Sequence, residues 1–376
     1  MQSSEQPAQH GGVVVTHLPL HERVSEHERV TLLGFAGRLA CLRHDALVGR
    51  YDPTGSYEGH VYFVPSSTLC AEQAEALGIR GPDDLFGGVV PHRFVGTKAI
   101  SHPLLAPGAT APAGWRPELV PLLGDAVLAG YSAFDLDDAR QAGLQLLARG
   151  PVRVKPVRSS GGRGQSVVRD AAQLQDLLDR MDRAELVAHG LVLEENLDDI
   201  RTFSVGQVRV GNLLASYFGF QRLTRNNEGH EVFGGSDLSV VRGDFDRLLA
   251  ERLAPEIRQA IEQARRYVAA VHACYPGFYA SRKNYDIAAG RDASARRRSG
   301  VLEQSWRVGG ATGPELAALQ VLRAQPQRSL VRASCYEVFG DSPEPPPGAV
   351  VYFRGIDPQL GPLTKYTVVE DHGDAG

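Results

Sequence analysis

Cysteines are few and long hydrophobic runs are missing, and both absences exclude classes of protein. The 376 residues include four cysteines, and no two of them form a CxxC pair. Zinc ribbons and thioredoxin-type chemistry are therefore excluded, and a reducing compartment is expected. No apolar run approaches the roughly 18 residues of a membrane-spanning helix, and the N-terminus lacks the features of a signal peptide. We therefore expect a cytoplasmic protein that has no membrane partner.

An excess of charge is also missing. The chain has 40 Lys and Arg against 44 Asp and Glu, which gives a net charge of −4. Such a balance argues against nucleic acid as a partner, so we expect a small-molecule substrate.

Several familiar sequence motifs are absent as well. The glycine-rich segment Ser159–Ser166 has neither the GK[ST] ending of a P-loop nor the third glycine of a Rossmann fingerprint, and the chain contains no GxSxG or HExxH.

What is present predicts a mixed α/β and α+β protein of several units. Apolar residues make up 43% and charged residues 22%, as is usual for globular chains. Residues 1–12 are polar and are expected to be disordered. Strands and helices alternate over 13–93, which predicts an α/β domain with a mostly parallel sheet. Residues 94–192 are expected to form a linker and a strand–helix unit, and 193–376 a mainly β core with a long helix and a closing β segment. A homodimer is also considered.

The first candidate for chemistry combines a lysine and a glycine loop. Lys155 ends a predicted strand, and a second strand follows the loop that contains Ser160, Gly161, Gly162 and Gly164. Backbone N–H groups of such a loop can bind phosphates, while the lysine adds a positive charge. A glycine-rich hairpin with a surface lysine explains the same residues equally well.

The second candidate is a pair of carboxylates. Glu303, Ser305 and Arg307 alternate and therefore share one face if they lie on a strand. Asp286 is expected on the neighbouring strand, where it can stand beside Glu303. Paired carboxylates suit Mg²⁺ bound to nucleotide phosphates, and Arg307 can stabilise charge that develops during transfer. A solvated polar face of a sheet remains the alternative.

The order of these features resembles the ATP-grasp superfamily over about residues 94–325. The resemblance implies that Asp286, Glu303 and Ser305 bind Mg²⁺, with the Ser305 hydroxyl where family members usually carry Asn, and that Arg307 is the transition-state arginine. It implies a lid that binds ATP and a hinge that borders adenine, with these candidates for nucleotide binding: Lys98, Lys155, Ser160, Gly161, Gly162, Gly164, Glu194, Glu195 and Leu197. Arg201 stands near the usual position of the ribose-binding acid, so either Asp198 or Asp199 would take that role. The chain also resembles a proteobacterial family of ATP-grasp-like proteins known as a domain of unknown function.

The resemblance implies an ATP- and Mg²⁺-dependent ligase that forms ADP. A substrate carboxylate would become an acylphosphate, which an amine-type nucleophile would then attack. Lys155 and Arg307 would be the catalytic residues. Two alternatives stay open. An ATP-dependent small-molecule kinase would use the same phosphate site with a hydroxyl acceptor, and a non-catalytic protein would bind the nucleotide without turnover.

Overall fold

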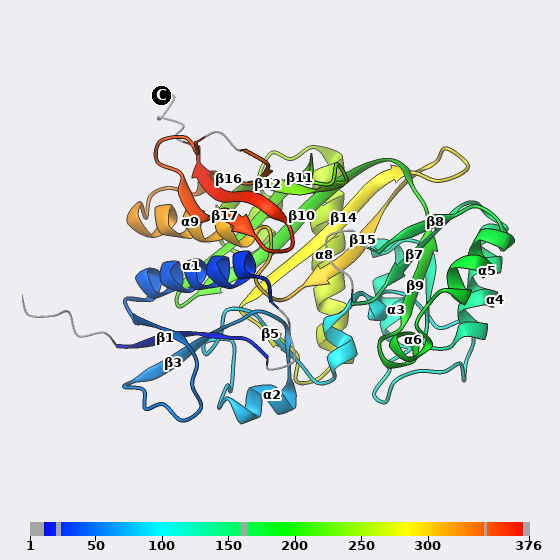
Figure 1. Cartoon of the computed structure of the whole chain (residues 1–376), viewed down its shortest axis with the longest axis horizontal. Coiled ribbons are helices and arrows are strands. Elements are labelled where there is room, and N and C mark those ends of the chain that lie inside the picture. Colours follow the sequence, from blue (N-terminus) through cyan, green and yellow to red (C-terminus); the bar gives the residue numbers. More distant parts are fainter. Residues whose placement is uncertain (1–10, 20–23, 159–163, 342–343, 371–376) are drawn as a thin grey trace, which may run out of the picture.

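The computed structural model arranges the chain in four sheets, two of which line a large cavity. It describes residues 11–19, 24–158, 164–341 and 344–370. The N-terminal unit lies at one end of the molecule, and a small sheet with its helices lies at the other (Figure 1). The largest sheet spans the space between them. No helix in these ranges is long and apolar enough to cross a membrane.

The N-terminal unit is a parallel sheet covered by one helix. Its three strands have the order β2-β1-β3, and both pairings are parallel, as the alternation of strands and helices predicted. Ser25 and Glu28 form a capping box at the start of the helix. The bounds are β1 (Gly12–His17), α1 (Glu26–Arg43), β2 (Ala46–Arg50) and β3 (His60–Pro65). Because β1 begins at Gly12, the expected disordered tail of residues 1–12 is too long by at least this residue, and residues 1–10 lie outside the described ranges.

A short sheet joins this unit to the rest of the chain. Its order is β13-β5-β4, and it pairs a strand from beyond residue 278 with strands before residue 91. Residues 93–101 then form two 3₁₀ turns, η1 (Arg93–Gly96) and η2 (Lys98–Ser101). The other elements are β4 (Leu69–Cys70), α2 (Ala71–Ala76), β5 (Gly88–Val90) and β13 (Tyr279–Ala280).

The second unit, here called the lid sheet, is antiparallel and has the order β6-β9-β7-β8. It begins only at Gly130, because the residues before it, including Ile100, Leu119 and Leu123, pack into the core around α8. The bounds are α3 (Leu119–Leu123), η3 (Gly124–Ala126), β6 (Gly130–Ala133), α4 (Leu136–Leu147), β7 (Val152–Pro156), β8 (Ser166–Val168), α5 (Ala171–Asp179), α6 (Arg183–His189) and β9 (Leu191–Glu195).

The large sheet has eight strands in the order β15-β14-β10-β11-β12-β16-β18-β17, and every pairing is antiparallel. Its strands are β10 (Asp198–Val210), β11 (Leu213–Arg225), β12 (Glu231–Arg242), β14 (Arg282–Arg291), β15 (Arg297–Ser305), β16 (Leu330–Phe339), β17 (Val350–Asp357) and β18 (Gly361–Val369). Its helices are α7 (Phe245–Leu249), α8 (Pro255–Cys274) and α9 (Thr312–Ala324).

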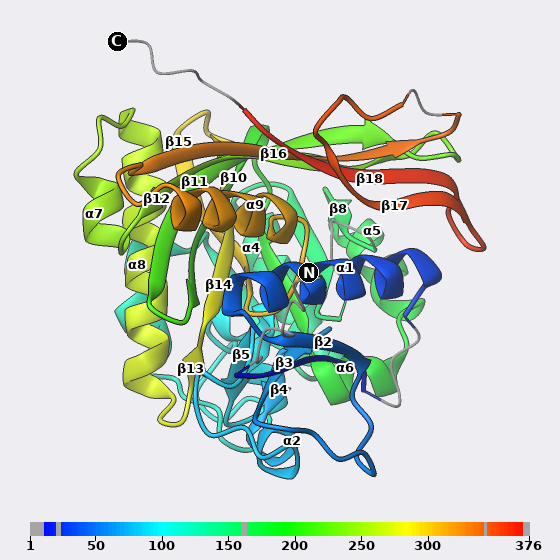
Figure 2. The same cartoon turned by 90° about the vertical axis from the view of Figure 1, so that its left-hand side faces the viewer.

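Different helices pack on the two faces of this sheet. Tyr285 and Ile287 of β14 pack against α8. Successive side chains of a strand point to opposite faces, so Asn284 and Asp286 point away from α8. On that second face α9 and α1 lie together under strands β16 to β18 (Figure 2), and the cavity occupies the remaining space. The alternation along β14 therefore separates an apolar face from the polar face of the site.

Candidate functional site

A cavity of about 1290 Å³ lies between the lid sheet, the large sheet and the N-terminal unit. Lys155 and Glu194 line it from the lid sheet, and Asp286 and Glu303 line it from the large sheet. Thr31 of α1 belongs to the far wall. Pockets for drug-sized ligands usually measure about 300–1,000 Å³, so this cavity can hold a large ligand together with a smaller one.

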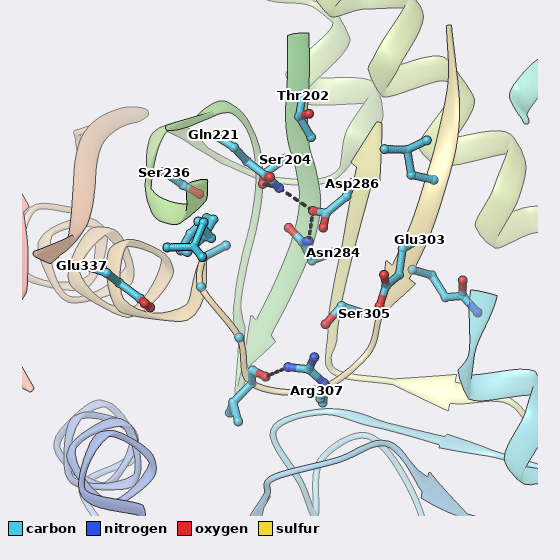
Figure 3. A pocket seen from close by; sticks show the side chains of 18 of the residues that line it. Thr202, Ser204, Gln221, Ser236, Asn284, Asp286, Glu303, Ser305, Arg307 and Glu337 are labelled. Carbon is cyan, nitrogen blue, oxygen red and sulfur yellow. Dashed lines mark hydrogen bonds between the residues drawn. The ribbon is translucent and has the colours of Figure 1, made fainter. Parts of the chain in front are cut away.

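Asp286 and Glu303 stand directly opposite each other on adjacent strands. Their pairing is in register between β14 and β15, and a bulge follows on the Ile287 side. Both side chains point into the cavity (Figure 3). Burial, and then the charge of Glu303, raises the pKa of Asp286 to about 6. A carboxylate held this way gains stabilisation from any cation placed beside it.

Amide side chains surround the buried oxygen of Asp286. Gln221 Nε2 donates to Asp286 Oδ1 at 2.8 Å, and it also donates to Ser204 Oγ at 3.0 Å. The Asn284 carboxamide lies 3.1 Å from the same Asp286 oxygen (Figure 3). These contacts hold one oxygen of Asp286 in a fixed direction. They come from strands β10, β11 and β14, which lie next to one another in the sheet.

A buried ion pair supports the backbone at Ser305 and Arg307. Arg282 and Glu315 are almost fully buried, and their side chains meet at two points, Nε to Oε2 at 2.9 Å and Nη2 to Oε1 at 2.7 Å. Arg282 Nη1 also donates to the carbonyl oxygen of Ser305 at 3.2 Å and to that of Arg307. The hydroxyl of Tyr217 contacts Glu315 as well. A buried pair with satisfied hydrogen bonds keeps this backbone in one position.

Lys98 reaches the carboxylate pair from η2. Its Nζ atom lies 2.9 Å from Glu303 Oε2, and its side chain is 1% exposed. Lys98 does not line the cavity itself. The expected first lysine of the nucleotide site therefore contacts one of the expected metal ligands, and Glu303 carries a counter-charge in this state.

A second group of charges lies on the lid sheet. Lys155 of β7 forms an ion pair with Glu194 of β9, and both side chains are buried. His102 Nε2 lies 3.3 Å from Glu194 Oε2. Burial alone would raise the pKa of Glu194, but the Lys155 charge and the His102 contact outweigh it and hold that pKa below its usual value. Glu194 is thus ionised and fixes Lys155 beside the cavity.

Most of the expected site residues come together. Those that line the cavity are Lys155, Glu194, Glu195, Leu197, Asp286, Glu303, Ser305 and Arg307. Asp198 and Gly164 are exposed, and neither is among the lining residues. Ser160, Gly161 and Gly162 lie outside the described residues.

Arg201 and Thr202, at the usual position of the ribose-binding acid, point to opposite faces of the sheet. Arg201 pairs with Glu256 at 2.5 Å, and its guanidinium lies 5.1 Å from the centre of the Phe220 ring. It therefore lies on the α8 side of the sheet. Thr202 points the other way and lines the cavity. The period of the strand thus brings a hydroxyl, and no acid, to this part of the wall.

Several residues that support the site were not predicted. Asn284 stands two residues before Asp286, so strand alternation could have placed it on the same face. Gln221, Glu315 and His102 gave no such signal. They lie 65, 33 and 92 residues from the residues that they contact, which are Asp286, Arg282 and Glu194. Such contacts depend on strand order and helix packing. Local sequence patterns therefore do not predict them.

Comparisons with known proteins agree with this architecture. A family model described as a protein of unknown function (DUF3182) matches residues 14–367. No curated protein matches the chain in sequence. The biotin carboxylase–β,γ-ATP complex from Campylobacter jejuni is similar over 95% of this chain and 87% of its own, with a TM-score of 0.52 and 10% identity. N5-carboxyaminoimidazole synthetase from Staphylococcus aureus is similar over 96% and 94%, with a TM-score of 0.49 and 14% identity. The likeness to biotin carboxylase shows a shared fold, and the chain has the ATP-grasp fold that the order of its motifs predicted.

Proposed function

The chain belongs to the DUF3182 family, and we propose that it is an ATP- and Mg²⁺-dependent ligase that forms ADP. The placement of Asp286 opposite Glu303, on the wall that faces the buried Lys155, carries this proposal. Carboxylates on one wall and a lysine on the other suit a nucleotide whose phosphates bridge the two sheets. The ATP complex of the biotin carboxylase with the same fold supports the choice of nucleotide.

The donor atoms at the carboxylate pair fit Mg²⁺. Asp286 and Glu303 supply oxygen ligands, and Mg²⁺ at phosphate sites is commonly bound by one or two carboxylates together with phosphate and water. Bound there, the ion would neutralise charge on the transferred phosphate. Lys155 would bind phosphate oxygens from the lid sheet, and its partner Glu194 would hold the lysine in position.

The proposed reaction has two steps. An oxygen of the substrate carboxylate attacks the γ-phosphorus, the bond to the β-phosphate oxygen breaks, and ADP leaves with that electron pair. An amine then attacks the acyl carbon and expels inorganic phosphate. Arg307 lines the cavity beside Ser305, and in the described chain no acidic side chain forms an ion pair with it. Its Nη1 atom donates to the carbonyl oxygen of Val308 at 2.6 Å, and the rest of the guanidinium would bind the charge on the phosphate during transfer.

Nucleotide binding tests the metal site first. A non-hydrolysable ATP analogue should bind in calorimetry with Mg²⁺, and binding should weaken strongly in EDTA. Glu303→Gln should weaken the Mg²⁺-dependent binding, because it removes one ligand charge. Glu337→Gln is the matched control: Glu337 lines the same cavity but pairs with Lys365 at 2.7 Å. Equal affinity in wild type and Glu303→Gln would refute the metal assignment. Melting of each variant without ligand separates a folding defect from a binding defect, since Glu303 also pairs with Lys98.

Product analysis tests the reaction. Wild-type protein with ATP, Mg²⁺ and a fractionated metabolite extract should release ADP, and hydroxylamine should trap the acylphosphate as a hydroxamate. A phosphorylated hydroxyl product without hydroxamate would identify a kinase. Nucleotide binding with no ADP from any fraction would favour the non-catalytic alternative.

A further inference from the structure

The carboxylate pair stands beside an amide that neither the motifs nor the comparisons assign to it. Asn284 pairs in register with Ser305, just as Asp286 pairs with Glu303, so the four side chains form a square on one face of β14 and β15. Across the described ranges, no cluster of three or more His, Cys, Asp or Glu side chains could hold a metal ion. Further side-chain ligands from these ranges would have to be uncharged, and the Asn284 carboxamide, on the same strand as Asp286, lies 3.1 Å from Asp286 Oδ1.

The hydrogen bonds of the Tyr217 hydroxyl determine which atom of the Asn284 carboxamide faces Asp286. The hydroxyl of Tyr217 contacts both Glu315 and the Asn284 carboxamide, the latter at 2.9 Å. A phenol has a single proton to donate. The Arg282 guanidinium, which has only donors, donates to both oxygens of Glu315, so Glu315 is the acceptor in these contacts. Tyr217 must therefore donate to Glu315, and its oxygen accepts a hydrogen bond from the NH₂ group of Asn284.

This orientation turns the carbonyl oxygen of Asn284 toward Asp286. A half-turn of the carboxamide exchanges its oxygen and nitrogen with little change in shape. The atom facing Asp286 Oδ1 lies 3.1 Å from it, so two oxygens then face each other at that distance. Two acceptors this close repel each other unless a proton or a cation lies beside both.

The separation fits a shared metal ion. In an octahedral shell with metal–oxygen distances of about 2.1 Å, neighbouring ligand oxygens lie about 3.0 Å apart. We propose that Asn284 is a ligand of the Mg²⁺ ion held by Asp286 and Glu303, and that it supplies from β14 the amide oxygen that Ser305 cannot supply from β15. The inference rests on the proposed function, because it assigns a ligand to the same metal site.

Metal binding to three variants tests the assignment. The probe is Mn²⁺, titrated by electron paramagnetic resonance into the full-length protein with a non-hydrolysable ATP analogue. Asn284→Ala should weaken Mn²⁺ binding by about tenfold or more, because an oxygen ligand is lost. Asn284→Asp keeps an oxygen in the same place and adds a charge, so it should bind Mn²⁺ at least as tightly as wild type. Asn226→Ala is the matched control and should change the affinity less than threefold, because Asn226 lines the same cavity but its side-chain oxygen accepts hydrogen bonds from the backbone of Glu228 and His230 in its own turn.

The aspartate variant separates the two orientations of the amide. If the NH₂ group of Asn284 instead donates to Asp286, Asn284→Asp removes that donor and adds repulsion. Its Mn²⁺ affinity would then fall as in Asn284→Ala, and this result would overturn the inference. Asn284→Asp is nearly isosteric, so it decides the question even if the alanine variant does not fold. Failure of the wild type to bind Mn²⁺ with the nucleotide would instead refute the proposed function.

Discussion

Replacing Glu315 by glutamine should strongly destabilise the protein, although Glu315 does not touch the proposed ligands. Glu315 is 0% and Arg282 1% exposed, so the substitution leaves the guanidinium buried without its counter-charge. Breaking a buried pair in this way typically costs about 3–5 kcal/mol. A neutral glutamine still accepts one hydrogen bond, so we expect a value near 3 kcal/mol, close to the lower limit.

Urea unfolding of the ligand-free protein measures this loss, and an exposed pair gives the control. Glu251 pairs with Arg247 at 2.7 Å on the surface, where the two side chains are 32% and 45% exposed. Glu251→Gln removes the same charge from solvent and should change the free energy of unfolding by less than about 0.5 kcal/mol. Both variants replace the glutamate of an Arg–Glu pair, but one pair is buried and the other is exposed. The difference between their losses in free energy of unfolding therefore gives the cost of leaving the Arg282 charge buried without its partner.

A double-mutant cycle tests the cause. Arg282→Met should be about as harmful as Glu315→Gln, since it strands the carboxylate. Arg282→Met combined with Glu315→Met removes both charges and should cost much less than the two single losses together. Nucleotide binding with Mg²⁺ should not recover in the double variant, because Arg282 no longer binds the carbonyl oxygens of Ser305 and Arg307. Losses in the single variants below about 1 kcal/mol, or additive losses in the cycle, would refute the reasoning.

Three further predictions concern pH and the transferred phosphate. Since burial and Glu303 raise the pKa of Asp286 to about 6, Mg²⁺-dependent nucleotide binding should weaken as the pH falls below 6, and calorimetry between pH 5 and 8 should show it. Burial would raise the pKa of Asp357, but backbone N–H groups, including that of His27 at 3.2 Å, hold it at about 2. Its stabilising effect is therefore complete above about pH 4 and is lost as the pH falls toward 2, and urea unfolding should find this loss absent in Asp357→Asn. Arg307→Lys keeps the charge but loses the planar fork, so ADP formation should fall more than nucleotide affinity; an equal fall in both would contradict a role in the transition state.

Local patterns in the sequence were sufficient for the elements and for the face that carries the carboxylates. A strand alternates its side chains whatever surrounds it, so the spacing of Glu303 and Ser305 already placed both on one face. Asp286 was expected on a neighbouring strand, and the structure pairs it with Glu303 in register. The order of the lysines, the glycine loop and the acids was likewise enough to predict the fold, which the likeness to biotin carboxylase shows.

The tertiary structure decided which of these residues share the cavity and what holds them there. Arg201 and Thr202 are neighbours in sequence, yet only Thr202 lines the cavity, because Arg201 points to the face covered by α8. Glu315 contacts Arg282 across 33 residues, and His102 contacts Glu194 across 92. Burial and the orientation of an amide depend on which elements pack together, and these contacts join segments far apart in the chain. The sequence by itself thus determined the chemical groups and their local spacing, whereas long-range packing determined their charge partners, their orientation and their access to the cavity.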